Sequence, residues 1–139
     1  MSIQRAEFFR NELIQELHYV AKAMREESDL EKRIFLFSAA YGITSRTFRY
    51  VFSKDVLLAD FVLTQVYNLL MNRFNQIQGI DTDGSLQLKL NELSDELDDL
   101  AAGFDTGKDI ANPLKNILTI GYSVTGNGIY LEQKGELEV

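Results

Sequence analysis

Apolar residues recur at three- and four-residue intervals along most of this chain, which is the spacing of helices that bury one side. The strictest series, spaced 4-3-4-3, is Leu86, Leu90, Leu93, Leu97 and Leu100. Such a seam is typical of helices that pack side by side at shallow angles. A single proline, Pro113, interrupts the pattern. The spacing therefore predicts a bundle of long helices.

We expect one all-α domain, residues 1–139, built as an antiparallel four-helix-type bundle with a short fifth helix and a C-terminal β-hairpin. The expected helices cover residues ~3–27, ~29–52, ~54–78, ~86–102 and ~113–118. The second helix is expected either to run unbroken to Phe52 or to break near Gly42. The strings ILTIGYSV, TGNG and IYLEQK predict the β-hairpin over residues ~118–134.

The composition excludes several kinds of site. The chain has no cysteine and a single histidine, His18, which excludes disulfides, thiolate metal sites and multi-histidine centres. No apolar run approaches the ~20 residues of a membrane span, so we expect no membrane partner. The N-terminal string MSIQRAEFFRNE lacks the apolar block of a signal peptide. We therefore expect a cytoplasmic protein.

The formal net charge of −7 is unevenly distributed along the chain. Residues 1–79 hold seven arginines and three lysines against nine acidic residues, a net charge of +1. Residues 80–139 hold four lysines against twelve acidic residues, a net charge of −8. The acidic half argues against nonspecific nucleic-acid binding, which needs a basic face. We expect the two halves to attract each other, within one chain or between chains.

Two of the expected helices carry more surface for contact than one packing partner requires. Phe8 and Tyr19 lie opposite the main apolar stripe of the first helix, where the fifth helix, the hairpin or another chain could cover them. Arg73 lies within the apolar arc of the third helix, so it needs a carboxylate partner unless its guanidinium reaches water. The other face of that helix is polar but uncharged: Thr64, Asn68, Asn72 and Asn75. We therefore expect a homo-oligomer, most simply a C2 dimer, with Phe8, Tyr19 and Arg73 at its interface.

Residues 38–52, SAAYGITSRTFRYVF, resemble a helix-turn-helix with Gly42 at the turn. In that motif the second helix enters the major groove, where arginine reads guanine edges or holds phosphates. The resemblance implies that the DNA-binding residues are Ser45, Arg46, Thr47, Arg49 and Tyr50. A DNA-binding regulator is therefore an alternative function, and a buried bundle helix with a tolerated glycine is the purely structural explanation.

The fourth expected helix contains the string NELSDELDD, in which acidic residues repeat at i,i+3 spacing: Glu92, Asp95, Glu96 and Asp99. Helical carboxylate pairs can hold Mg²⁺ together with substrate phosphates. The pairs are similar to those of all-α nucleotide pyrophosphohydrolases. The string LNELSDELDDLA also resembles a helix of the adenosyltransferase-type bundles that act on cobalamin. These resemblances imply a Mg²⁺-dependent nucleotide-handling or cofactor-binding bundle, and a solvated acidic face is the structural explanation.

No arrangement of residues in the sequence resembles a complete catalytic set, so an enzyme is less expected than a binding protein. We therefore expect a non-catalytic, oligomeric helical bundle that works through contacts with protein and has no resident cofactor. The DNA-binding regulator and the Mg²⁺-dependent bundle are the two alternatives.

Overall fold

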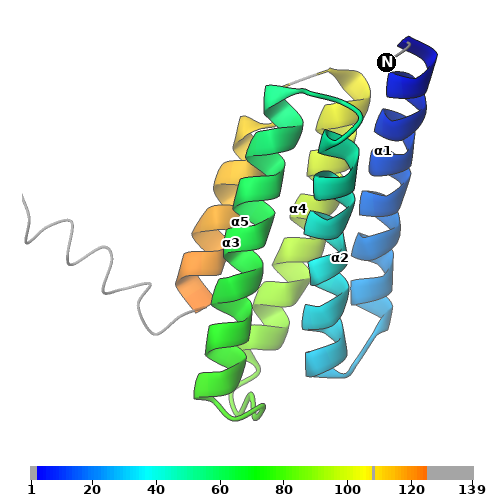
Figure 1. The fold of residues 1–139 in the computed structure, drawn as a ribbon. Helices are drawn as coiled ribbons and strands as arrows, with labels where there is room; N and C mark the ends of the chain where they lie inside the picture. Colours follow the sequence, from blue (N-terminus) through cyan, green and yellow to red (C-terminus); the bar gives the residue numbers. More distant parts are fainter. Residues whose placement is uncertain (1–2, 108, 125–139) are drawn as a thin grey trace, which may run out of the picture.

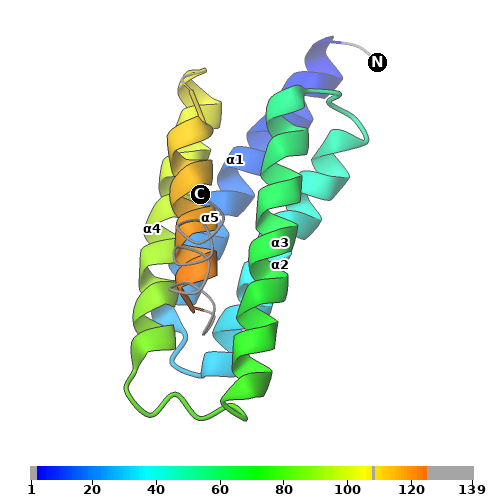
Figure 2. The same ribbon diagram turned by 90° about the vertical axis from the view of Figure 1, so that its left-hand side faces the viewer.

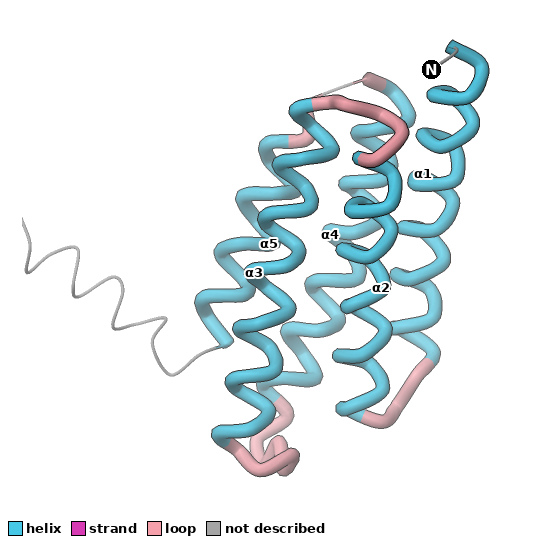
Figure 3. The backbone as a smooth tube through the Cα atoms, viewed as in Figure 1, coloured by secondary structure: helices cyan, strands magenta, loops and turns pink. Residues whose placement is uncertain are grey.

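The computed structural model of the protein describes residues 3–107 and 109–124, and every regular element in these ranges is a helix (Figures 1 and 3). The helices are α1 (Ile3–Glu26), α2 (Leu30–Phe48), α3 (Lys54–Gln76), α4 (Ser85–Thr106) and α5 (Ala111–Val124). The all-α bundle expected from the apolar spacing is thus confirmed. None of the described helices is both long and apolar enough to cross a lipid bilayer.

The helices form a closed ring in the order α1, α2, α3, α5, α4, because each packs against its two neighbours in that order. Helices α1, α3 and α5 run in one direction, and α2 and α4 run in the other (Figures 1 and 2). Figure 2 shows α5 between α3 and α4, which do not contact each other. The fifth helix therefore completes the wall of the bundle.

The core is built from the apolar stripe that each helix turns towards the centre. The expected seam of α4 is fully confirmed, since all five of its leucines are buried: Leu86, Leu90, Leu93, Leu97 and Leu100. The stripe of α1 is buried in the same way at Leu13, Leu17, Val20 and Met24. Because burial follows the helical repeat, the sequence pattern alone was enough to locate this core.

Polar caps begin two of the helices close to where the sequence places them. The side chain of Asp29 accepts a hydrogen bond from the backbone N–H of Lys32 and begins α2. The Ser53 hydroxyl accepts one from the backbone N–H of Asp55 and begins α3. Each cap satisfies a backbone donor that the first helical turn leaves without a partner.

The C-terminal hairpin is the main error of the sequence-based expectation. Residues 118–124, expected to form a strand, belong instead to α5, and residues 125–134 lie outside the described part of the chain. The buried residues of α5 recur at helical spacing: Pro113, Leu114, Ile117, Gly121 and Val124. The β-branched residues that suggested a strand are tolerated in this helix, because packing on neighbours outweighs a weak local preference.

Two glycines that could have ended helices lie inside them. Helix α2 runs unbroken through Gly42 to Phe48, so the turn of the expected helix-turn-helix is absent. Helix α4 continues past Gly103 and ends at Gly107, whose φ of 68° suits a C-terminal glycine. A Cβ on Gly103 would lie 2.9 Å from a methyl carbon of Ile110, so this glycine permits the chain to pass closely at that point.

Candidate interaction surface

Two stretches of sequence without charge lie side by side along the bundle. Residues 34–45 of α2 and residues 61–72 of α3 contain no aspartate, glutamate, lysine or arginine. The two helices are antiparallel neighbours, and the ring centroids of Tyr41 and Tyr67 are 5.4 Å apart. The Thr44 hydroxyl donates a 2.9 Å hydrogen bond to the Asp60 carboxylate. This register sets the two uncharged stretches level with each other over their whole length.

The exposed side chains of these stretches form a surface that we name the α2–α3 face. Its residues are Phe35, Ala39 and Gly42 of α2, and Phe61, Gln65, Asn68 and Asn72 of α3. Phe35 is 71% exposed and Phe61 is 61% exposed. Single exposed apolar residues are common, whereas aromatic residues on a continuous face without charge mark a contact site.

A groove of about 210 Å³ opens at one end of the α2–α3 face. Its lining residues are Glu31, Lys32, Phe35, Tyr67 and Met71. The aromatic rings and the adaptable thioether give it a mainly apolar lining, to which Glu31 and Lys32 add two charged side chains. Phe61 projects at the opposite end of the face, one residue after the Asp60 that bonds Thr44. The face thus carries a projecting aromatic ring at one end and an apolar groove at the other.

The residues expected at an interface have different environments. Phe8 is 57% exposed and Tyr19 is 69% exposed, so no described helix covers them. Arg73 is half-buried and lines a small cavity of about 100 Å³ with Lys89. Within the described residues Arg73 makes no hydrogen bond or ion pair, although its charge acts on Asp83, so no buried ion pair forms inside the bundle and a partner across an interface stays a prediction.

The buried arginine of the bundle is Arg33, which the sequence-based interpretation missed. Only 4% of it is exposed. Its Nε donates to the backbone carbonyl of Met24 at 2.8 Å, and its terminal nitrogens donate to side-chain oxygens of Gln87 and Asn91. Burial lowers the pKa of Arg33 from its ordinary value. Its place three residues after Leu30 on the buried stripe was the available signal.

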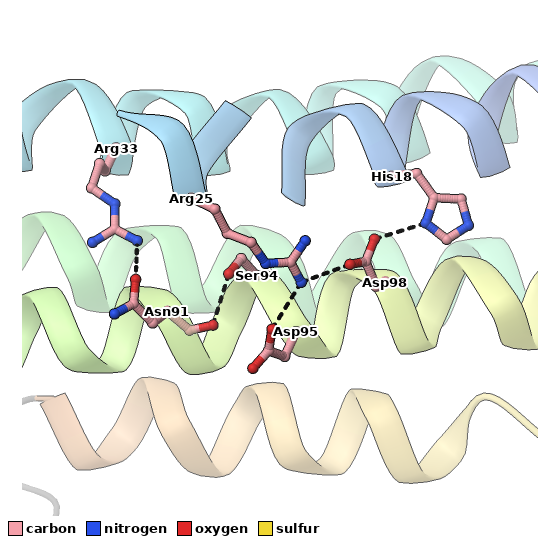
Figure 4. A network of polar contacts seen from close by, with 7 residues as sticks. All are labelled: His18, Arg25, Arg33, Asn91, Ser94, Asp95 and Asp98. Carbon is pink, nitrogen blue, oxygen red and sulfur yellow. Dashed lines mark hydrogen bonds and ion pairs between the residues drawn. The ribbon is translucent and has the colours of Figure 1, made fainter. Parts of the chain in front are cut away.

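A network of charged side chains joins α1 to α4 (Figure 4). His18 Nδ1 lies 2.7 Å from Asp98 Oδ1, and Arg25 Nη2 lies 2.6 Å from Asp98 Oδ2 and 2.8 Å from Asp95 Oδ1. Partial burial opposes ionisation of Asp98, but its hydrogen bonds to His18 and Arg25 outweigh that effect and lower its pKa. Hydrogen bonds to Asp95 and Asp98 raise the pKa of Arg25. These contacts tie the two halves of the chain together, as their opposite charges predicted.

Three of the four carboxylates considered for Mg²⁺ line one open groove between α4 and α5. In that groove Glu92 forms an ion pair with Lys89 at 3.2 Å, and Glu96 accepts a hydrogen bond from Asn116 at 3.0 Å. Asp95 belongs to the network with Arg25, and Asp99 does not line the groove. Among the described residues no group of three or more acidic or histidine side chains could hold a metal ion. Mg²⁺ binding stays a prediction.

The five residues considered for DNA binding do not share one free face. Thr47 is buried, and its hydroxyl donates to the Ile43 carbonyl at 2.8 Å. The Tyr50 ring stacks on Phe9 with centroids 4.0 Å apart, and Arg46 forms an ion pair with Glu16 of α1. Ser45 is half-buried, and Arg49 is exposed at the end of α2. DNA binding by this segment stays a prediction.

The fold and its surfaces together define a class of protein, an all-α helical bundle with an exposed, uncharged and partly aromatic face. Comparison with known proteins adds no family to this class, since no protein-family model, curated protein or solved structure matches the chain significantly.

Proposed function

We propose that this protein is a non-catalytic protein-interaction module that works as a homo-oligomer, most simply a dimer. The observation that carries the proposal is the α2–α3 face, which combines exposed aromatic rings with uncharged polar side chains. Protein interfaces are enriched in aromatic residues and methionine, and their centres are depleted of charge. Amide side chains lose less hydration energy on burial than lysine or glutamate and can still form hydrogen bonds.

The exposed aromatic residues of α1 support the same proposal. Phe8 and Tyr19 lie on a helix outside the α2–α3 face, and no described element covers them. Exposed aromatic rings thus occur in two separate regions of the surface, and exposed apolar surface of this kind favours contact with another molecule. A protein that contacts more than one partner, or a copy of itself and a second protein, accounts for both. The cytoplasmic location stays a prediction.

Native mass spectrometry of the protein as purified tests the proposal. We expect a discrete oligomer, most simply twice the mass of the chain, with no additional mass from a small molecule, metal or nucleic acid. Denaturing mass spectrometry of the same sample provides the control for the mass of the chain itself. Retention of a nucleotide, a metal ion or an oligonucleotide in stoichiometric amount would contradict the interaction module and favour one of the two alternatives.

A thermal-shift series separates those alternatives. A ligand that binds only the folded state raises the melting temperature, and the rise grows with the logarithm of its concentration relative to Kd. We expect no rise with millimolar Mg²⁺ and none with a duplex oligonucleotide at low salt. A rise with Mg²⁺ that Asp95→Asn removes, or a rise with DNA that Arg46→Ala and Arg49→Ala remove, contradicts the proposal.

A further inference from the structure

We infer that the occupant of the α2–α3 face is a second copy of this chain, related to the first by a two-fold axis at the level of Ala39 and Gly42. This inference rests on the proposed function, and it adds the surface, the symmetry and the contacting residues. In such a dimer each copy uses the same face, so every contact occurs twice.

The first argument comes from charge. Each copy has a net charge of −7, so two copies repel each other wherever their charged faces approach. The exposed face of α4 is one such charged face, because it carries Glu92, Asp95 and Asp99. A two-fold axis through such a face sets like charges close together. The α2–α3 face has no charge along residues 34–45 and 61–72, so two copies meet there without that penalty.

The second argument comes from Gly42, which the monomer does not need. A helix with glycine at an interior position is less stable than the same helix with alanine there. Gly42 is exposed, it has no positive φ, and a Cβ built on it meets no atom within 4 Å. Gly103 and Gly121, by contrast, each lie against a side chain of the same chain. Nothing within the monomer accounts for Gly42, whereas the close approach of a second copy would account for it.

The third argument is the complementarity of the face with itself. Phe61 projects at one end, and the groove beside Phe35, Tyr67 and Met71 opens at the other. The middle of the face between these ends lies at the level of Ala39 and Gly42, given the register set by Thr44 and Asp60. A two-fold axis there exchanges the ends and brings each copy's Phe61 to the other copy's groove. The small residues at the centre let the helices approach.

The size of the face sets the strength of the dimer that we expect. Stable interfaces bury about 800 Å² on each partner, and an aromatic side chain contributes about 150–250 Å² when it is fully buried. The α2–α3 face offers two exposed phenylalanines with small and amide neighbours, so the area it can bury lies at the lower end for a stable interface. We therefore expect dissociation in the micromolar range and a dimer at tens of micromolar.

Sedimentation velocity of the full chain over ~1–200 µM tests the arrangement. We expect wild type to dimerise and Phe61→Glu to raise the dimer Kd at least tenfold, because it replaces the ring that fills the groove with a smaller, charged side chain. Leu88→Glu is the matched control, since Leu88 is a similarly exposed apolar residue on α4. It should leave Kd within twofold of wild type. Circular dichroism checks that each variant is folded.

Gly42→Ala provides a second variant that we expect to fold at least as stably as wild type, because an added Cβ meets no atom within 4 Å. We expect it to raise the melting temperature of the monomer and to raise the dimer Kd at least threefold, two effects of opposite sign. A dimer that survives both Phe61→Glu and Gly42→Ala but is lost in Tyr19→Glu overturns this inference and leaves the proposed oligomer intact. A wild-type chain that stays monomeric at 200 µM overturns the inference and the homo-oligomer together, while a retained ligand in native mass spectrometry overturns only the proposed function.

Discussion

Two arginines lie on apolar stripes of this bundle, but only Arg33 is buried. The difference lies in the hydrogen-bond acceptors around each side chain. Arg33 donates to a helix-end carbonyl and to the amide oxygens of Gln87 and Asn91, which offset part of the cost of burying its charge. Arg73 has no such partner among the described residues and keeps part of its surface in water. A buried guanidinium therefore does not require a carboxylate when enough neutral acceptors converge on it.

The substitution Arg33→Ala is expected to lower the free energy of unfolding by roughly 2–4 kcal/mol, because it leaves the buried Met24 carbonyl and two partly buried amide oxygens without their donor. The matched control is Arg73→Ala, which should change it by no more than about 0.5 kcal/mol. Urea unfolding followed by circular dichroism measures both. Equal losses for the two variants would mean that Arg73 has a buried partner or that the Arg33 contacts contribute little.

Asp98 predicts a pH dependence of stability. Its pKa is lowered in the folded protein, while an unfolded aspartate has a pKa of about 3.9. Its contribution is therefore complete above that value and is lost as the pH falls through the folded pKa. We expect Asp98→Asn to lower the free energy of unfolding by roughly 1 kcal/mol at pH 7, a modest effect because the pair is partly exposed. This difference from wild type should shrink as the pH falls below about 3.9 and vanish below the folded pKa.

The control for this measurement is Asp99→Asn, because Asp99 is the exposed neighbour of Asp98 and has no partner among the described residues. Urea unfolding of the three proteins at several pH values compares them directly. A loss of stability in Asp98→Asn that is independent of pH would contradict an electrostatic origin.

At the scale of the element, α2 and α5 each contain a glycine within the helix, and the surroundings of the two glycines differ. Gly121 faces α3, where an added Cβ would lie 2.8 Å from a methyl carbon of Val66. It lets α5 approach α3 closely enough to complete the ring. Gly42 faces open space. Gly121 is thus explained by packing within the chain, whereas no contact within the monomer explains Gly42.

These environments predict opposite effects on stability. Gly121→Ala should destabilise the fold by roughly 1–3 kcal/mol, because the core must shift to admit a methyl group. Gly42→Ala should stabilise the monomer by roughly 0.5–1 kcal/mol, because alanine is the better helix former. Urea unfolding below 1 µM protein keeps association out of the measurement. Destabilisation by Gly42→Ala would show that its position in α2 is constrained within the monomer.

At the scale of the whole molecule, the interhelical ion pairs and the α2–α3 face lie on different sides of the bundle. The seam between α1 and α4 holds the His18, Arg25 and Asp98 network and links the basic half of the chain to the acidic half. The α2–α3 face lies elsewhere on the ring and has no charge along its exposed residues. One side therefore joins two helices by ion pairs, while another exposes aromatic and uncharged polar side chains.

This separation predicts how salt acts on the oligomer. Two chains of charge −7 repel each other over several ångströms, and added salt screens that repulsion. An interface without ion pairs loses nothing to the same screening. We therefore expect the dimer Kd to fall severalfold when NaCl rises from about 50 to 300 mM, as measured by sedimentation velocity. Weakening of the dimer by salt would point instead to an interface that depends on charged pairs.

The sequence by itself determined four of the five helices and most of the core. The 4-3-4-3 leucines of α4 and the stripe of α1 are buried as their spacing predicted, since the helical repeat is a local property of the chain. The cap Ser53 began α3 for the same local reason. These features need no knowledge of what lies opposite each helix.

Only the tertiary structure decided the rest. Residues 118–124 are helical because α5 packs between α3 and α4, and Gly42 does not break α2 because the helix continues along its neighbours. The buried position of Arg33 depends on acceptors that stand more than fifty residues away in sequence. The α2–α3 face exists because antiparallel packing sets residues 34–45 level with 61–72. No single window of sequence contains both stretches, so only the register between the helices could bring them together.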